Sequence, residues 1–176
     1  MLRLVVAVLF LALLPASFAE AQAKAKAPTL VMTMENGGTV MIELWPDVAP
    51  NHVKNFVELT QQGFYDGQRI HRVDPKFVVQ FGDPASKTKP IDDPGMGRGG
   101  SGKTIKAEFS KKPFDRGVLG MARTDDPDSA SSQVYLMLGD SHFLNGQYTA
   151  FGKVTKGMDV VDKMKIGDRI KSIKVQ

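Results

Sequence analysis

Short segments of alternating apolar and polar residues, separated by Gly- and Pro-rich stretches, constrain the fold of this chain most strongly. Successive side chains of a strand point to opposite faces of its sheet, so this alternation is typical of half-buried strands. The pattern predicts strands at 29–35, 39–45, 69–73, 77–81, 118–123, 133–138, 150–154 and 170–175. Helical spacing of apolar residues predicts helices at 50–62 and 158–164. Many short strands with two helices predict a mainly β protein, an antiparallel barrel or sandwich.

The first residues have the pattern of an export signal. Arg3 is followed by an apolar run over 4–14 and by small residues up to Ala19, where we expect cleavage, with Ala21 or Ala23 as alternatives. The run is shorter than the roughly 20 residues that a membrane-spanning helix needs. We therefore expect a signal peptide at 1–19, a linker at 20–28 and one domain at 29–176. The mature protein is expected to be periplasmic or secreted. An uncleaved membrane anchor is the alternative.

Composition narrows the classes of partner and of stabilising bond. The chain has no cysteine, so neither disulfides nor thiolate metal sites can hold the fold. It has 23 Lys and Arg against 19 Asp and Glu; without Arg3 of the expected signal the balance is 22 − 19 = +3. The lysines are scattered along the chain. We expect no nucleic-acid partner, because no basic face is predicted.

Residues 64–83 carry the most specific motif, FYDGQRIHRVDPKFVVQFGD. Further blocks follow in the same order, namely GMAR at 120–123, SSQVY at 131–135, FLNG at 143–146, FGKV at 151–154 and GM at 157–158. Taken together these blocks resemble the cyclophilins, and the resemblance covers about 29–175. It implies a closed eight-stranded antiparallel barrel capped by two helices. It also implies a monomeric peptidyl-prolyl cis-trans isomerase, or rotamase, that binds proline-containing polypeptides, assists folding and uses no cofactor.

Rotation of an X-Pro bond requires little chemistry from the residues of a site. Rotating an X-Pro bond opposes amide resonance, with a barrier of about 18–20 kcal/mol, but breaks no bond. A site needs only to bind the twisted amide better than the planar one. Twisting localises a lone pair on the proline nitrogen, which the permanently charged, planar guanidinium of Arg72 can stabilise. Strand alternation places Ile70 and Arg72 on a common face, and does the same for Val78 and Gln80 and for Gln133, Tyr135 and Met137, so a single surface can carry these groups.

The resemblance also implies a role for each matching position. Arg72 and Gln80 correspond to catalytic positions. The residues expected to bind substrate are Phe77, Val78, Ala122, Arg123, Gln133, Tyr135, Phe143, Leu144 and Tyr148. Either glutamine, Gln80 or Gln133, could bind the peptide backbone or orient Arg72. Phe77 could belong to the core or to the pocket, whereas the hydroxyl of Tyr135 favours an exposed place in the groove.

Several positions depart from the usual pattern of the family. Val78 stands where methionine is common, Tyr135 where phenylalanine is usual, and Tyr148 where many members have histidine. These changes affect the expected substrate preference more than the reaction. Phe143 replaces the tryptophan whose indole N–H binds cyclosporin in sensitive members, so we expect weak cyclosporin binding. A proline-peptide-binding chaperone module with little turnover is the alternative function.

A second motif points to another class of protein. Residues 97–104, GRGGSGKT, satisfy the phosphate-binding pattern of nucleotide hydrolases. That site needs a buried strand before the motif and a helix after it. Residues 87–94 are polar and Pro-rich, and 105–109 are too few for a helix, so nucleotide binding is not expected. His52, His71 and His142 lack ligand-like spacing, and 125–128 lack the glycine and glutamate of a calcium loop, so no metal is expected.

Overall fold

The structure, a computed structural model, describes residues 27–176. The expected signal peptide and most of the expected linker lie outside the described residues. The strands are β1 (Thr29–Met34), β2 (Thr39–Leu44), β3 (Arg72–Asp74), β4 (Val78–Phe81), β5 (Val118–Met121), β6 (Val134–Met137), β7 (Ala150–Lys156) and β8 (Ile170–Val175). The helices are α1 (Pro50–Gln61) and α2 (Met158–Val161), with short 3-10 turns at Pro84–Lys87, Pro127–Ser129 and His142–Leu144. None of the described helices is long and apolar enough to cross a bilayer.

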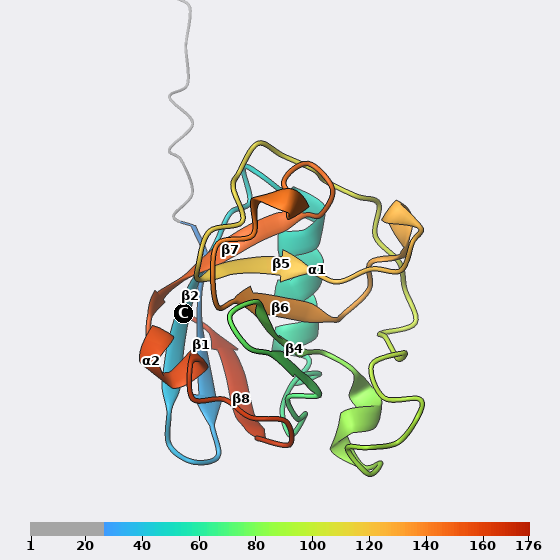
Figure 1. Ribbon diagram of the computed structural model, residues 1–176, viewed down its shortest axis with the longest axis vertical. Coiled ribbons are helices and arrows are strands. Elements are labelled where there is room, and N and C mark those ends of the chain that lie inside the picture. The colour runs from blue at the N-terminus through green and yellow to red at the C-terminus, as the bar shows by residue number, and fades with distance from the viewer. Residues whose placement is uncertain (1–26) are drawn as a thin grey trace, which may run out of the picture.

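All eight strands belong to one curled antiparallel sheet, in the order β3-β4-β6-β5-β7-β2-β1-β8 (Figure 1). The expected closed barrel is wrong, because the edge strands β3 and β8 do not pair along their lengths. One isolated bridge joins Arg69 to Arg169 across this gap. On either side of this bridge the N–H groups of Ile70 and Ile170 donate to carbonyl oxygens of the facing segment, at 2.9 and 2.8 Å. The strand predicted at 69–73 begins only at Arg72, so the two edges meet over a short segment and the sheet stays open.

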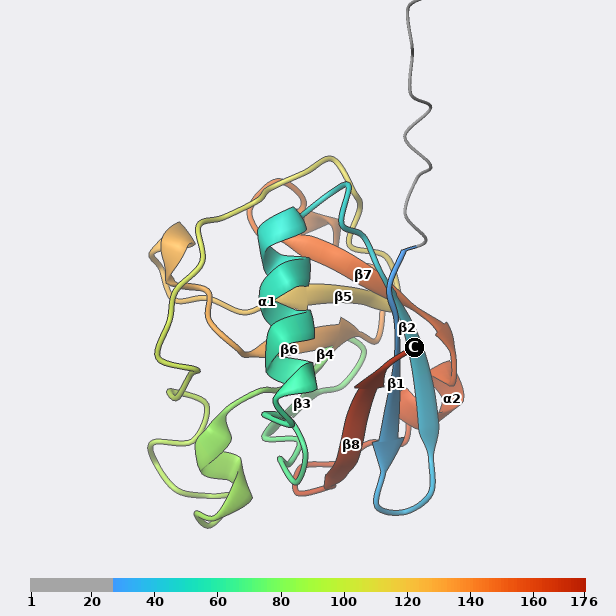
Figure 2. The same ribbon diagram turned by 180° about the vertical axis from the view of Figure 1, so that it is seen from behind.

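The sheet has a buried cluster on each of its two faces. Helix α1 covers one face, as the opposite views of Figures 1 and 2 agree, and its Phe56 packs against Tyr65 with ring centroids 4.8 Å apart. Met32 and Met121 also lie in this cluster. A smaller cluster on the other face is built around Tyr135 and includes the buried side chains Val78, Phe114, Val118, Met137, Leu144 and Ala150. This second cluster forms the floor of the site described below.

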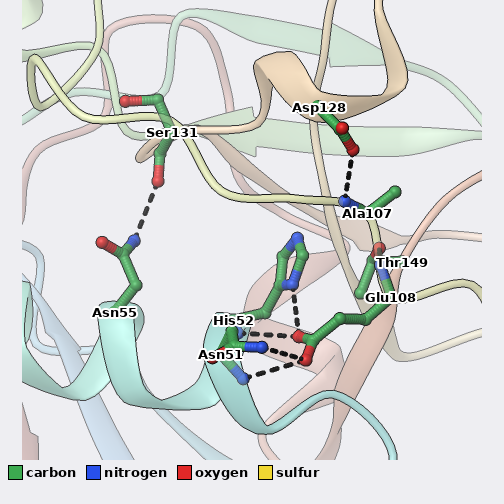
Figure 3. A network of polar contacts seen from close by, with 8 residues as sticks. All are labelled: Asn51, His52, Asn55, Ala107, Glu108, Asp128, Ser131 and Thr149. Atoms are coloured by element: carbon green, nitrogen blue, oxygen red, sulfur yellow. Dashed lines mark hydrogen bonds and ion pairs between the residues drawn. The ribbon is translucent and has the colours of Figure 1, made fainter.

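A carboxylate from a distant loop caps the N-terminus of α1 (Figure 3). The helix has Pro at its first position and no cap from its own Ala49. Instead Glu108 accepts hydrogen bonds from the backbone N–H groups of Asn51 and His52, at 3.1 and 3.0 Å. It also accepts from Asn51 Nδ2 at 2.8 Å and pairs with His52 Nδ1 at 2.7 Å. A carboxylate at this place satisfies the free N–H groups and favours the helix dipole.

Burial and this contact shift the protonation of both partners. Burial lowers the pKa of His52, although its hydrogen bond to Glu108 and the charge of that carboxylate oppose the shift. Burial alone would raise the pKa of Glu108, but hydrogen bonds from His52 and Asn51 outweigh it and leave the pKa below its usual value. The pair therefore consists of a neutral imidazole and a carboxylate at neutral pH, and it fastens the loop containing Glu108 to α1.

Candidate active site

An apolar pocket of about 310 Å³ opens on the face of the second cluster. It is lined by Arg72, Phe77, Val78, Gln80, Ala122, Arg123, Tyr135, Phe143, Leu144 and Tyr148. Every residue that the sequence predicted for the site except Gln133 lies in this lining. The volume is at the lower end of the range of small-ligand sites, and it suits a compact apolar group such as a proline ring.

The register of three neighbouring strands sets the polar side of this apolar pocket. Arg72 of β3 lies opposite Gln80 of β4, and Gln80 lies opposite Tyr135 of β6. Directly opposed residues share a face of the sheet. The sequence prediction that Val78 shares this face with Gln80 is confirmed, because both line the apolar pocket.

Arg72 lies at the rim of the apolar pocket with about half of its side chain exposed. Its Nη1 donates to Gln80 Oε1 and its Nη2 donates to Asp74 Oδ2, each at 3.2 Å. The guanidinium carbon lies 5.6 Å from the centre of the Phe77 ring, within the range of a cation–π contact. The predicted common face of Ile70 and Arg72 is wrong. Ile70 is fully buried in the first cluster, because it precedes β3 and alternation does not continue across the strand boundary.

Two glutamines connect Arg72 to the backbone of the glycine-rich loop. Gln80 Nε2 donates to Gln133 Oε1 at 2.8 Å. Gln133 Nε2 in turn donates to the carbonyl oxygens of Gly97 and Gly99, both at 2.8 Å. Of the two roles that the sequence left open for these glutamines, the geometry supports orientation of Arg72.

Tyr135 forms the floor of the apolar pocket rather than an exposed wall. Only 5% of its surface is exposed, and its hydroxyl is buried without a hydrogen-bond partner among the described residues. The prediction of an exposed tyrosine is therefore wrong. The ring packs on Gly120, where a Cβ atom would lie 2.4 Å from it, so the position requires glycine. Burial raises the pKa of the Tyr135 hydroxyl far above its usual value, so the group stays neutral.

The walls of the apolar pocket combine aromatic and charged groups. Phe77 is half-buried and its ring centre lies 5.7 Å from that of Phe143, so Phe77 belongs to the pocket wall. Phe143 is 66% exposed at the rim. On the other side Arg123 lies over Tyr148, with 4.4 Å between its guanidinium carbon and the ring centre. Arg123 also lines a second cavity.

The second cavity, of about 300 Å³, lies beside the glycine-rich loop 97–100, and we call it the glycine-loop pocket. It shares Gln80, Ala122 and Arg123 with the apolar pocket and also contains Gln133. Sequence reasoning missed Arg98 in its lining. The GRGG motif at 97–100 carries this arginine, but the motif alone does not indicate a pocket.

The geometry that a phosphate-binding loop requires is absent from residues 97–104. No strand directly precedes the segment, and Ile105 after it forms an isolated bridge to Ala130 instead of opening a helix. The loop is instead held by Asp83, whose buried carboxylate accepts from the N–H groups of Gly97 and Gly99 at 2.7 and 3.2 Å. The motif therefore builds the wall of a pocket.

Among residues 27–176, one group of three side chains could present metal-ligand atoms together, all within 4.8 Å: Asp115, Asp140 and His142. His142 Nε2 already pairs with Asp115 Oδ1 at 2.8 Å, and Asp140 Oδ1 accepts from the N–H of Arg116. All three lie at the surface, on loops that sequence spacing could not bring together. The hydrogen bond between His142 and Asp115 and the backbone contact of Asp140 account for the arrangement.

The fold and the site define a class of protein, a β-sheet protein with a small pocket of aromatic and aliphatic side chains beside a fixed cation. Residues 29–175 match the family model described as cyclophilin type peptidyl-prolyl cis-trans isomerase/CLD. The chain belongs to the cyclophilin-type peptidyl-prolyl cis-trans isomerase family and is an isomerase.

Individual relatives agree with this assignment. A probable peptidyl-prolyl cis-trans isomerase of Brucella suis is 47% identical over 142 residues, which cover 79% of this chain and 72% of the relative. Peptidyl-prolyl cis-trans isomerase B of Bacillus subtilis is 39% identical, covering 81% and 94%. A crystal structure of a Cryptosporidium parvum cyclophilin-type isomerase matches with a TM-score of 0.73 at 25% identity, covering 85% of this chain and 98% of the other. A structure of that protein in the presence of the dipeptide Ala-Pro gives a TM-score of 0.72.

Proposed function

We propose that this isomerase accelerates rotation of X-Pro bonds in exported polypeptides, with Arg72 as the catalytic residue and the apolar pocket as the proline site. The single observation that carries this proposal is the position of Arg72. Its guanidinium lies at the rim of a proline-sized pocket, fixed by Gln80 and by the Phe77 ring. The Ala-Pro dipeptide used with the Cryptosporidium parvum relative supports a proline-containing ligand.

The proposed mechanism uses the chain's own groups alone. Phe77, Leu144 and Tyr135 enclose the proline ring, while the peptide on its N-terminal side can rotate over the rim. As the C–N bond twists, the proline nitrogen gains a lone pair, and the N–H groups of Arg72 stabilise this charge more strongly than the planar amide. Gln80 keeps the guanidinium in place, so little reorganisation is needed during the rotation. No proton transfer, nucleophile or cofactor is required.

Exchange spectroscopy by NMR on a peptide with one proline tests the proposal, because it measures cis–trans exchange directly. Arg72→Ala should reduce the enzyme-catalysed exchange rate about a hundredfold, the size of losing a preorganised charge donor. Arg72→Lys should recover only part of this rate, because it keeps the charge but not the planar fork. Lys171→Ala, at an exposed position of β8, is the matched control and should leave the rate unchanged.

Two outcomes would contradict the proposal. Unchanged exchange with Arg72→Ala would remove Arg72 from the catalytic role. Peptide binding by the wild-type protein without faster exchange would favour a binding module or chaperone with little turnover, the function that the replacements at Val78, Tyr135 and Tyr148 left open.

We further propose that the chain acts outside the cytoplasm, in the periplasm or after secretion, and assists folding of exported proteins. The apolar run 4–14 and the small residues before Ala19 support a cleaved signal followed by the linker 20–28 and the domain 29–176. We also propose a monomer without a stable membrane anchor. Mass spectrometry of the protein recovered from a bacterial periplasm would test the cleavage site. An N-terminus at Met1 in the mature protein would contradict it.

Weak cyclosporin binding belongs to the same proposal. The exposed Phe143 occupies the place of the indole donor of cyclosporin-sensitive members, and a phenyl ring has no N–H to offer. Phe143→Trp restores that donor. Tighter cyclosporin binding by Phe143→Trp than by the wild-type protein, measured by titration, is the expected result.

A further inference from the structure

The turn between β3 and β4, residues 74–77, contacts the guanidinium of Arg72 at both of its ends. At the first residue of the turn, Asp74 Oδ2 accepts from Arg72 Nη2 at 3.2 Å. At the last residue, the centre of the Phe77 ring lies 5.6 Å from the guanidinium carbon. The lining of the apolar pocket includes Phe77 but not Asp74. The carboxylate therefore acts on the site through Arg72 and not as part of the pocket wall.

The sequence of this turn fixes its conformation. The N–H of Phe77 donates to the carbonyl oxygen of Asp74 at 3.0 Å and closes a β-turn. Pro75 sets φ at the second position, and Lys76 at the third has a φ of 67°, as a type II turn requires. Lys76 is the one residue other than glycine with a positive φ within residues 27–176. Lysine is less favourable than glycine in this conformation, so the contacts around the turn must maintain it.

The segment after β6 supports the turn from behind. The N–H of Leu138 donates to the carbonyl oxygen of Phe77 at 2.8 Å. A Cβ atom on Gly139 would lie 2.5 Å from the carbonyl oxygen of Lys76, so the two backbones are in close contact there. The turn is thus attached to the neighbouring strand at two consecutive residues. Asp74 and Phe77 are held at a fixed spacing around Arg72.

Gln80 alone holds only one end of the guanidinium. It accepts from Nη1 of Arg72, whereas Asp74 accepts from Nη2. Rotation about the Nε–Cζ bond exchanges these two nitrogens, so it requires that both hydrogen bonds break. A guanidinium has five N–H groups, and donors remain for a ligand when Gln80 and Asp74 each take one. The ion pair is exposed, at 48% for Arg72 and 46% for Asp74, so its effect is expected to be modest.

We propose that Asp74 is a positioning residue for catalysis, which together with Gln80 holds both ends of the Arg72 guanidinium so that its remaining N–H groups face the proline nitrogen. The inference rests on the proposed function, because it takes Arg72 as the catalytic residue. A donor that is already oriented needs little reorganisation while the amide twists. A carboxylate also lowers the positive potential of its partner, but solvent and salt screen that effect at an exposed site. Loss of Asp74 should therefore slow the rotation and leave peptide binding unchanged.

Exchange spectroscopy at varied peptide concentration separates kcat from KM. Asp74→Ala should lower kcat about two- to fivefold, the range that an exposed ion pair allows, without a change in KM. Asp74→Asn keeps an acceptor oxygen at this place and should lose less. Asp162→Ala is the matched control, because it breaks an ion pair with Arg116 of similar exposure, 43% and 41%, away from both pockets. It should retain the wild-type kcat.

Rotation about the Nε–Cζ bond of Arg72 gives a measurement that needs no turnover. In NMR spectra of ¹⁵N-labelled protein without peptide, this rotation should be faster in Asp74→Ala than in the wild type, and unchanged in Asp162→Ala. In the Arg72→Ala background, Asp74→Ala should cause no further loss of exchange.

Three results would overturn the inference: a kcat of Asp74→Ala at or above the wild-type value, a change in KM alone, or rotation of the guanidinium at the wild-type rate in Asp74→Ala. An equal fall of kcat in Asp162→Ala would overturn it as well, because the effect would then not be specific to the site. Failure of the proposed function is distinguishable, since it appears as normal exchange in Arg72→Ala, whereas the rotation of the guanidinium is measured independently of catalysis.

Discussion

The amide of Gln80 donates a hydrogen bond from Nε2 to Oε1 of Gln133, at 2.8 Å. This contact is consistent with only one orientation of each of the two side-chain amides. Both N–H groups of Gln133 are directed at carbonyl oxygens of the glycine-rich loop, so its oxygen faces Gln80. The oxygen of Gln80 then faces Arg72, to which it is the acceptor at 3.2 Å. Each amide has one acceptor oxygen and one donor nitrogen, and reversing either would set like groups against each other.

Gln133→Leu should lower kcat/KM about tenfold, which corresponds to 1.36 kcal/mol of transition-state stabilisation. The substitution keeps the size of the side chain but leaves Gln80 free to turn its oxygen away from Arg72. Because Gln133 acts through Arg72, the fall should appear in kcat more than in KM, measured by exchange at varied peptide concentration. The kcat/KM of Gln133→Glu should also fall, because a carboxylate has no N–H groups to donate to the loop carbonyls.

Gln61→Leu, at the exposed end of α1, is the matched control and should retain wild-type kcat/KM. Activity of Gln133→Leu within twofold of the wild type would show that Arg72 does not depend on the loop. A rise in KM alone would instead assign Gln133 to direct contact with the peptide.

Tyr135→Phe should raise the free energy of unfolding by about 1 kcal/mol, because it removes a buried hydroxyl that has no hydrogen-bond partner within residues 27–176. Tyr65→Phe provides the matched control. Its hydroxyl is equally buried but donates to the carbonyl of Ser132 at 3.1 Å, so its removal should cost about 1 kcal/mol. Urea unfolding of both variants measures the difference. Equal losses of stability in the two variants would mean that the Tyr135 hydroxyl is satisfied in solution.

Most of the predicted site agrees with the alternation of side chains between the two faces of a strand. The faces of β4 and β6 followed from counting residues, so Val78, Gln80 and Tyr135 were expected together and line one pocket. Counting failed at Ile70, which comes before the first residue of β3, so Ile70 lies in the core while Arg72 lies at the surface. Alternation also predicts on which face of the sheet a side chain lies, but not how deeply it is buried. Burial of Tyr135 therefore could not be predicted from its position in the strand.

Contacts that loops create between distant segments could not be predicted. His52 and Glu108 are 56 residues apart, and no local pattern brings them together. The open edge of the sheet could not be predicted either, because residue alternation does not show how far two edge strands pair, and here the ladder is limited to the bridge between Arg69 and Arg169. The closed barrel was what the resemblance implied.

Stability should decrease as the pH falls from about 7 to about 5. Burial places the pKa of His52 and that of His71 below the ordinary value of 6.5. In this window the unfolded chain binds more protons than the folded one, so lowering the pH favours unfolding by at most 1.36 kcal/mol per pH unit for each group. The lowered pKa of Glu108 acts in the same direction but only below about its ordinary value of 4.5.

His52→Asn isolates the contribution of the buried pair. An asparagine can donate from Nδ2 toward Glu108, much as Nδ1 of His52 does, but it has no group that titrates in this range. Urea unfolding at a series of pH values should give a smaller slope of stability against pH for His52→Asn than for the wild type, with the remaining slope assigned to His71. His142→Asn, at the exposed surface, is the control for loss of a histidine. A slope that is unchanged in His52→Asn would mean that His52 is protonated in the folded protein throughout the window, as the cation of an ion pair with Glu108.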